Sequence, residues 1–207
     1  MDGLLLDTER LHLEAATEVV RALGLGDLSA TLRAMIGIRS AEGRALLAPA
    51  LGDRVSLEDF EARWSAGIDE LAARGVPVKT GVVALLTRLE AAGTPCAVAT
   101  SSRRAAAEAA LEEAGLRRFF ASVTGGDDVV HAKPDPEIYL RAATSLGIRA
   151  HEAVAFEDSE PGTRAAVASG ATVVQVPDLV APSDALRALG HVVAGDVLEG
   201  ARRAGLI

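Results

Sequence analysis

Two adjacent acids, Glu157 and Asp158, directly follow the short apolar run 153–156. Burying paired carboxylates without a cation costs on the order of several kcal/mol, so the sequence predicts a metal ion or a lysine beside them. Hard oxygen ligands of this kind suit Mg²⁺. The alternative is an acid pair that opens a helix, since Ser159 to Gly162 also make a good helix N-terminus. Metal binding is the interpretation that we favour.

A second chemical feature is Thr100, which ends an apolar run and precedes a helical stretch. Backbone N–H groups converge on anions at such a junction, so the position favours a bound phosphate or carboxylate. Ser101 or Ser102 could instead cap the helix, and both interpretations can hold together.

The basic residues are strongly biased towards arginine. Only two of the 21 are lysines, Lys79 and Lys133. Lysine carries a compact, movable ammonium, so its use at position 133 indicates a point charge in a site rather than a solvated surface residue. Lys79 lies in a loop-like stretch, and we attribute its identity to chance.

Alternating elements must position these residues. From about Gly75 onward, short β-like runs alternate with helical stretches, which predicts an α/β fold with a parallel sheet covered by helices. Asp135 is expected to cap a helix that starts at Pro136. The expected strands are 95–100, 122–124, 153–156, 172–176 and 191–194, and further helices are expected at 103–114 and 161–168. Ligands of such sheets bind at the carboxyl ends of the strands.

The segment from about Arg10 to Arg74 has a different pattern. Leu11, Ala15 and Val19 recur with helical spacing, and no convincing strand is present. Pro49 and Gly52 are expected to separate successive helices. We therefore predict a core formed by 1–9 and 76–207, with an all-helical cap domain, 10–75, inserted into it.

Composition excludes several classes of partner. A net charge of -8 argues against nucleic acid and anionic membranes, which need basic patches. Apolar stretches of membrane-spanning length and a basic leader are absent from the sequence. The single cysteine, Cys96, lies in an apolar run and is typical of a buried thiol in a reducing compartment. We expect a cytoplasmic protein.

Four segments in order resemble the motifs of the haloacid dehalogenase-like (HAD) superfamily: Asp2-Gly3 with Leu6-Asp7-Thr8-Glu9, then 97–102, Lys133-Pro134-Asp135-Pro136-Glu137, and Phe156-Glu157-Asp158-Ser159 with Pro161-Gly162. Their order and spacing are similar to the β-phosphoglucomutase-like branch, whose helical cap lies between the first two motifs. The resemblance implies a Rossmann-like core and Mg²⁺-dependent phosphoryl transfer. It covers essentially the whole chain.

The same resemblance assigns roles to the first motif. An aspartate attacks phosphorus to give an aspartyl-phosphate, and it aligns immediately before Met1. We therefore expect a misplaced start and a truncated first strand. Asp2 matches the general acid and base, and its backbone carbonyl matches a metal ligand. True dehalogenases lack this second carboxylate, so Asp2 favours phosphoryl transfer over carbon–halogen cleavage.

The other motifs supply the remaining expected site residues. The resemblance gives the phosphate to the Thr100 hydroxyl, the Ser101 amide and Lys133, which would also neutralise the nucleophile. It gives the metal to the nucleophile, to the Asp2 carbonyl and to Asp158, with Glu157 beside the ion and bound directly or through water. The expected substrate or cap residues are Asp7 and Thr8, at the hinge into the cap, with His12 and Arg39 in the cap itself. The mutases carry a distal-phosphate arginine where this chain has Ser40, which favours a phosphatase.

The sequence therefore predicts a magnesium-dependent phosphatase that hydrolyses a small phosphate monoester, such as a sugar phosphate. The alternatives are a phosphomutase that acts on a β-hexose 1-phosphate, or a catalytically inactive chain if Met1 is the genuine start. The expected partner is a small phosphorylated metabolite, with no nucleic acid and no membrane. The resemblance also implies a monomer.

Overall fold

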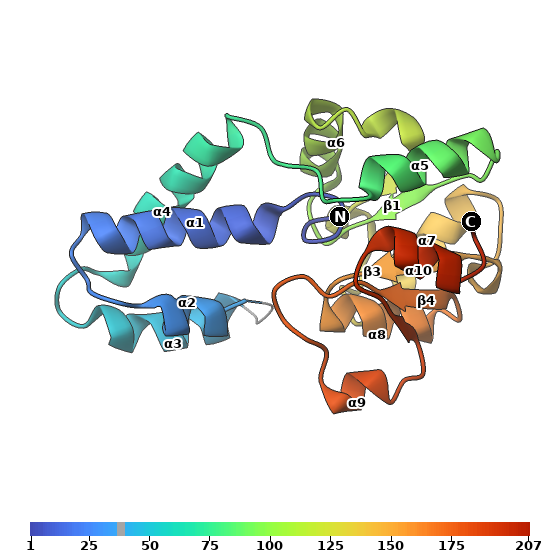
Figure 1. Cartoon of the computed structure of the whole chain (residues 1–207). Coiled ribbons are helices and arrows are strands. Elements are labelled where there is room, and N and C mark those ends of the chain that lie inside the picture. Colours follow the sequence, from blue (N-terminus) through green and yellow to red (C-terminus); the bar gives the residue numbers. More distant parts are fainter. Residues whose placement is uncertain (37–39) are drawn as a thin grey trace. The chain divides into compact units, whose positions relative to one another are not determined.

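The structure is a computed structural model that describes residues 1–36 and 40–207. It divides into two compact units (Figure 1). The core unit comprises Met1–Leu6 and Pro77–Ile207, and the helical unit comprises Asp7–Val76. These bounds differ by a few residues from the expected division into 1–9 with 76–207 and 10–75.

The core unit contains five short strands, all in parallel pairs. Strand β1 (Ala97–Ala99) pairs with β2 (Ser122–Thr124), and β3 (Val154–Glu157), β4 (Thr172–Gln175) and β5 (Val192–Val193) form a second sheet in that order. The register between β3 and β4 places Glu157 opposite Gln175. The expected α/β class with parallel sheets is confirmed.

Helices connect and cover these strands. The α-helices of the core unit are α5 (Val82–Ala91), α6 (Arg104–Glu113), α7 (Glu137–Ser145), α8 (Glu160–Ala168), α9 (Asp184–Arg187) and α10 (Val197–Arg203). Short 3₁₀ turns cover Arg117–Phe119, Gly126–Asp128 and Ala150–Glu152. Helix α7 packs on β1 and β2, α8 on β3 and β4, and α10 on β4 and β5. Each helix thus buries its apolar stripe on one of the two sheets.

The two sheets are not joined by strand pairing among the described residues. A cavity of about 400 Å³ is lined by β1 on one side and by Val154, Ala155 and Phe156 of β3 on the other. Met1, Leu4 and Leu5 also line it. Its lining is mostly aliphatic and aromatic, and it is partly open to solvent.

Two helix starts differ from expectation. Pro136, not Asp135, is the N-cap of α7, because the Asp135 carboxylate accepts a hydrogen bond from the Glu137 backbone two residues ahead (2.9 Å) and forms a turn before the helix. Arg103 is the N-cap of α6, without a side-chain cap. Neither Ser101 nor Ser102 caps that helix, and Ser102 has a different partner, described below.

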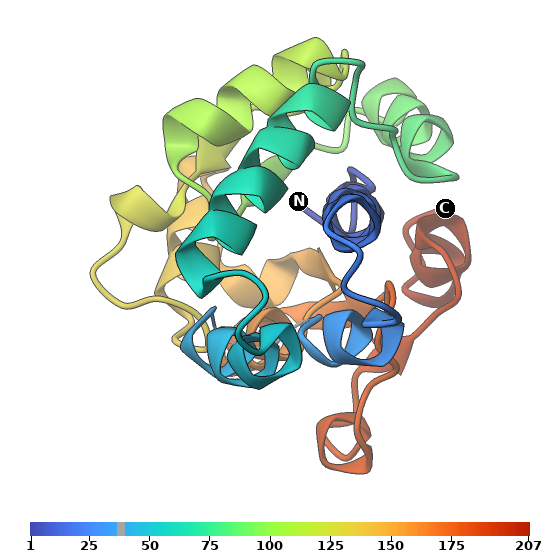
Figure 2. The same ribbon diagram turned by 90° about the vertical axis from the view of Figure 1, so that its left-hand side faces the viewer.

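The helical unit consists of α1 (Thr8–Ala22), α2 (Ser29–Ala34), α3 (Ser40–Leu51) and α4 (Leu57–Ala72). Helix α1 packs along α4 (Figure 2). Its core is aliphatic except for one ring, and it comprises Ala16, Val19, Val20, Leu25, Leu32, Leu47, Leu51 and Phe60. Pro49 lies inside the last turn of α3 and does not end it. The helix ends instead before Gly52, whose φ of 58° suits a helix terminus.

No helix within residues 1–36 and 40–207 is both long enough and apolar enough to cross a bilayer.

Candidate active site

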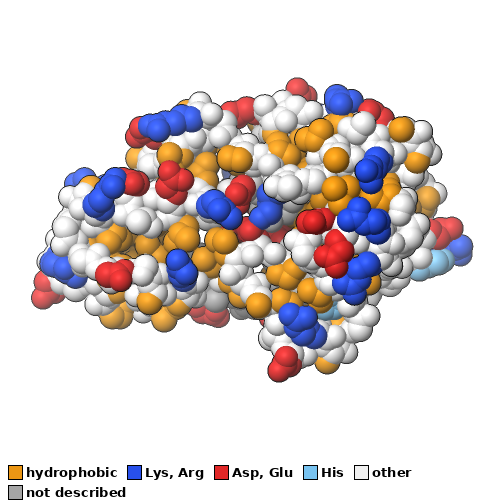
Figure 3. Space-filling view, in the orientation of Figure 1, with side chains coloured by type: hydrophobic (Ala, Val, Ile, Leu, Met, Phe, Trp, Pro, Cys, Tyr) orange, Lys and Arg blue, Asp and Glu red, His pale blue; other side chains and the backbone are white. Residues whose placement is uncertain are grey.

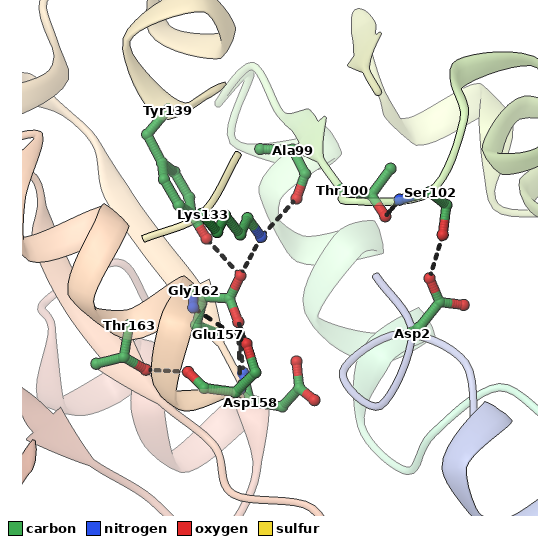
Figure 4. Close-up of polar contacts among 11 residues, drawn as sticks. Asp2, Ala99, Thr100, Ser102, Lys133, Tyr139, Glu157, Asp158, Gly162 and Thr163 are labelled. Carbon is green, nitrogen blue, oxygen red and sulfur yellow. Dashed lines mark hydrogen bonds and ion pairs between the residues drawn. The ribbon is translucent and has the colours of Figure 1, made fainter. Parts of the chain in front are cut away.

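The carboxyl ends of β1 and β3 are linked by one side chain, Lys133 (Figure 4). Its Nζ donates to the Ala99 carbonyl at the end of β1 (3.4 Å) and to Glu157 Oε1 at the end of β3 (2.5 Å). Both side chains of this ion pair are buried, with 9% and 5% of their areas exposed. Lys133 therefore lies at the shared edge of the two sheets, where parallel folds bind their ligands.

Glu157 is saturated by protein donors. Its Oε1 accepts from Lys133 and from the Tyr139 hydroxyl (2.6 Å). Its Oε2 accepts from three groups of the following turn: the Asp158 and Ser159 backbone amides and the Ser159 hydroxyl. Burial raises the pKa of Glu157 most strongly, but the Lys133 ammonium, the amino terminus and the hydrogen bonds from Lys133 and Tyr139 together outweigh burial and lower the pKa to about 2. These bonds favour Glu157 as an anchor for Lys133 rather than as a direct metal ligand.

The start of α8 is built around this carboxylate. A side chain at Gly162 would place its Cβ 2.1 Å from Glu157 Cδ, so only glycine lets the helix approach so closely. Ser159 caps the helix by accepting from the Gly162 backbone (3.2 Å). The acid pair therefore does open a helix, as the alternative interpretation of the sequence proposed, while Glu157 also holds the lysine.

Asp158 has a different environment from its neighbour. Burial raises the pKa of Asp158, and the charge of Glu157 adds to this effect, to give a pKa of about 7. Its Oδ2 faces the backbone of Gly3, where an added Cβ would lie only 2.3 Å away. Gly3 also has a φ of 70°, which L-residues rarely adopt. A buried carboxyl group set closely against the main chain at Gly3 suits an oxygen-liganded cation, whose positive charge would favour its ionised form.

Asp2 is held by the loop after β1. The Ser102 hydroxyl donates to Asp2 Oδ2 (2.9 Å), and the Ser102 backbone amide donates to Thr100 Oγ1 (3.2 Å). Thr100 is buried, and its own amide donates to the Thr124 carbonyl on β2 (3.0 Å). Ser101 lies between them with an exposed side chain. Strand β2 thus positions Thr100 by a hydrogen bond. Thr100 in turn positions Ser102, whose hydroxyl donates to Asp2.

These contacts close a ring within the core unit. It runs from Asp2 and Gly3 to Asp158, through Glu157 to Lys133, and back through Ala99, Thr100 and Ser102. The expected catalytic, phosphate-binding and metal-binding residues of the core therefore lie at one edge of the sheets: Asp2, Thr100, Ser101, Lys133, Glu157 and Asp158.

The expected substrate residues are not part of this ring. Asp7, Thr8 and His12 belong to the helical unit, where Asp7 precedes α1 and pairs with Arg10 (3.1 Å). The His12 side chain is exposed, and its carbonyl accepts from Trp64 Nε1 (2.9 Å). Arg39 lies outside the described residues.

Sequence reasoning missed a second buried ion pair, between Lys79 and Asp178. Their side chains are only 20% and 7% exposed. The scarcity of lysine was the available signal, and we attributed it to chance at position 79. Both lysines of this chain form buried ion pairs, whereas every arginine in a described ion pair is at least 30% exposed.

A surface group elsewhere also brings possible metal ligands together. Ligand atoms of His131, Asp135 and Glu137 lie within 4.8 Å of one another. Glu137 accepts hydrogen bonds from the Val130 and His131 backbones, and these bonds lower its pKa to about 2. These hydrogen bonds show that the group of His131, Asp135 and Glu137 stabilises the loop before α7.

Comparison with known proteins places these features in context. The family model described as haloacid dehalogenase-like hydrolase matches residues 1–176. A phosphorylated carbohydrates phosphatase of Thermotoga maritima is 33% identical over 170 residues, which cover 82% of this chain and 79% of the relative. The fructose-1-phosphate phosphatase YqaB of Escherichia coli is 34% identical over 184 residues, which cover 85% of this chain and 93% of the relative.

A solved structure supports the same comparison. The crystal structure of a HAD family hydrolase from Deinococcus radiodurans, with bound phosphate and sodium, is similar with a TM-score of 0.83 and 29% identity. The match covers 100% of this chain and 94% of that one.

Proposed function

The chain belongs to the haloacid dehalogenase-like hydrolase family as a phosphoric monoester hydrolase, and from that premise we propose that it hydrolyses a small sugar phosphate with Mg²⁺ as cofactor. The observation that carries the proposal is the ring of contacts joining Asp2, Thr100, Lys133 and Asp158 at the strand ends. Two relatives that are named sugar-phosphate or carbohydrate-phosphate phosphatases support the substrate class.

Asp158 and the backbone carbonyl of Asp2 are the residues that would hold the cation. Gly3 fits this role, because only a residue without Cβ lets the 2–3 backbone lie against the Asp158 carboxylate. When bound, Mg²⁺ supplies positive charge next to the phosphoryl oxygens. Glu157 takes no direct part in the coordination that we propose, since its oxygens already accept from five protein donors.

Lys133 binds the transferred phosphoryl group. An ammonium has three protons to donate, and Glu157 and Ala99 accept two of them. The third is directed to a phosphoryl oxygen, while the Glu157 carboxylate keeps the lysine from swinging away. The Thr100 hydroxyl and Ser101 amide complete the phosphate site at the neighbouring strand end.

Asp2 moves the proton. We assign it as the acid that protonates the leaving alkoxide and then as the base that accepts a proton from the attacking water. The Ser102 hydroxyl holds Oδ2, so Oδ1 is the oxygen that exchanges the proton. Because one oxygen of the Asp2 carboxylate is already held by a hydrogen bond, the side chain loses less orientational freedom when the reaction reaches its transition state.

The covalent step uses the aspartate whose expected position precedes Met1. The test therefore compares three proteins: the 207-residue chain, the chain extended by an apolar strand ending in Phe-Asp, and the same extension ending in Phe-Asn. Phosphate release is measured on a broad panel of sugar phosphates with and without Mg²⁺. We expect turnover only from the extension ending in aspartate, and only with the metal.

Two outcomes would contradict this proposal. A folded Phe-Asp protein that releases no phosphate from any monoester would end the hydrolase assignment. Isomerisation of a hexose 1-phosphate, stimulated by a bisphosphate and without net phosphate release, would favour the mutase instead.

A further inference from the structure

We propose that Asp178, oriented by Lys79, is a second carboxylate of the divalent-cation site and accepts a hydrogen bond from a water bound to the ion. The inference rests on the proposed function, because it takes Asp158 and the Asp2 backbone as the direct ligands. It assigns a role to a buried ion pair that the hydrolytic chemistry above does not use.

The strand register brings the two acids to one edge. Glu157 at the end of β3 lies opposite Gln175 at the end of β4. Asp158 follows the first strand directly, and Asp178 follows the second after a short turn. The Gln175 side-chain amide donates to the Asp158 carbonyl (3.4 Å) and ties the two strand ends together.

The carboxylates of Asp158 and Asp178 both lie close to the backbone of Gly3. A Cβ placed on Gly3 would be 2.3 Å from Asp158 Oδ2 and 3.5 Å from Asp178 Oδ2. Both oxygens therefore face the same point of the Asp2–Gly3 backbone, which is the segment that we assign to the metal. Asp178 reaches that point from β4, and Asp158 reaches it from β3.

The two oxygens of Asp178 differ in their partners. Oδ1 pairs with the Lys79 ammonium. Oδ2 is buried and accepts no hydrogen bond within residues 1–36 and 40–207, although the whole side chain is only 7% exposed. A buried acceptor needs a donor. Mg²⁺ keeps several of its waters in protein sites, and these waters are donors.

Lys79 suits this arrangement in position and in charge. Its backbone amide donates to the Leu5 carbonyl (2.9 Å), so the lysine is anchored to the same turn that carries Asp2 and Gly3. Its ammonium offsets the charge of Asp178. The carboxylate then offers an oriented acceptor while adding little net negative charge beside Asp158.

The test measures cation binding rather than turnover. Mn²⁺ binding to the full chain is followed by the loss of the free-ion signal in electron paramagnetic resonance, and Mg²⁺ is added as a competitor. The variants are Asp178→Asn, Lys79→Gln and Asp158→Asn. Glu90→Gln is the matched control, because it removes the carboxylate of an exposed ion pair with Arg118 in the same unit.

The proposal predicts opposite responses from the two partners of one ion pair. Asp178→Asn should weaken Mn²⁺ binding about ten- to a hundredfold, the range typical of outer-shell ligand partners. Lys79→Gln should bind Mn²⁺ at least as tightly as the unchanged chain, because the glutamine amide can still donate to Asp178 and orient it while the positive charge near the cation is removed. Glu90→Gln should match the unchanged chain.

Three results would overturn the proposal. Equal affinity of Asp178→Asn and the unchanged chain, with binding lost in Asp158→Asn, would remove Asp178 from the site and leave the proposed function intact. Weaker binding by Lys79→Gln and Asp178→Asn alike would identify a structural pair. An unchanged chain that takes up no Mn²⁺ would remove the cation site as a whole, and hydrolysis by the Phe-Asp protein would then be judged separately.

Discussion

Ion pairs at the strand ends of the core unit differ sharply from those of the helical unit. Lys133–Glu157 and Lys79–Asp178 are buried and use lysine. The ion pairs within the described part of the helical unit use arginine and are mostly exposed, for example Arg74–Glu70, whose side chains are 68% and 72% exposed. Basic and acidic side chains are also interspersed over the face of the molecule shown in Figure 3.

This contrast distinguishes ion pairs that can take part in the reaction from ion pairs that only contribute to stability. Exposed ion pairs contribute at most ~1 kcal/mol each, since water screens them. Buried pairs repay their desolvation only with good geometry and further hydrogen bonds. Glu157 has those further bonds, whereas Asp178 leaves one oxygen without them. The fold therefore buries charge at the edge where a phosphate and a cation are expected to bind.

Removing Lys133 should have the largest effect. Lys133→Met leaves the Glu157 charge buried and uncompensated, and we expect a loss of about 3–5 kcal/mol in the free energy of unfolding. Urea denaturation measures it. The double variant Lys133→Met with Glu157→Gln should recover most of that stability, but in the protein extended to Phe-Asp it should show no phosphatase activity. Recovery of activity in the double variant would contradict the role of Lys133 in phosphate binding.

Gly3→Ala should come next. The added Cβ meets Asp158 Oδ2 and also requires a left-handed backbone. Gly93→Ala is the matched control, because its φ is 68° and no atom lies within 4 Å of its added Cβ. We expect both to lose about 1–2 kcal/mol from backbone strain, and Gly3→Ala alone to lose cation binding. Thermal unfolding and Mn²⁺ titration separate the two effects, and equal Mn²⁺ affinities would contradict a site at Gly3.

Ser102→Ala should have a smaller effect, confined to turnover. It removes the hydrogen bond to Asp2. Bonds to charged groups contribute about 1.5–3 kcal/mol, so we expect kcat of the protein extended to Phe-Asp to fall about tenfold or somewhat more, with little change in KM. Ser145→Ala, which removes a hydroxyl bonded to Ser122 on the surface, is the control. A KM effect with an unchanged kcat would place Ser102 at the substrate rather than at Asp2.

Arg74→Ala should have the smallest effect. It removes the exposed pair with Glu70 (2.7 Å), and we expect less than about 0.5 kcal/mol in urea denaturation, since an exposed helical pair at this spacing contributes little. A loss comparable to that of Lys133→Met would erase the contrast between the two units.

Much of the site could be predicted from the sequence because its parts are local. Thr100 and Asp158 directly follow β1 and β3, and parallel strands bring such ends together. Asp2 and Lys133 were predicted from the motif resemblance and from the scarcity of lysine. The family assignment is confirmed by the match over residues 1–176. The strand 122–124 was expected with the bounds that it has.

The remainder depends on contacts between distant parts of the chain. Asp178 lies 99 residues beyond Lys79, and no local pattern indicates that pairing. Whether Glu157 contacts a metal or a lysine depends on where the fold places Lys133 and Tyr139. The composition of the chain does not determine their positions. Asp135 was expected to cap α7, and only the competing turn to Glu137 explains why Pro136 does so.

The cavity between β1 and β3 leaves part of the apolar interior of the core unit accessible to solvent. Apolar side chains that water reaches contribute less to stability than fully buried ones, and this recess of about 400 Å³ is lined by the single tyrosine, Tyr139. The single tryptophan, Trp64, packs on Phe60 in the helical unit. Each unit thus carries its own fluorophore, and we expect Tyr139 and Trp64 emission to report the unfolding of the two units separately.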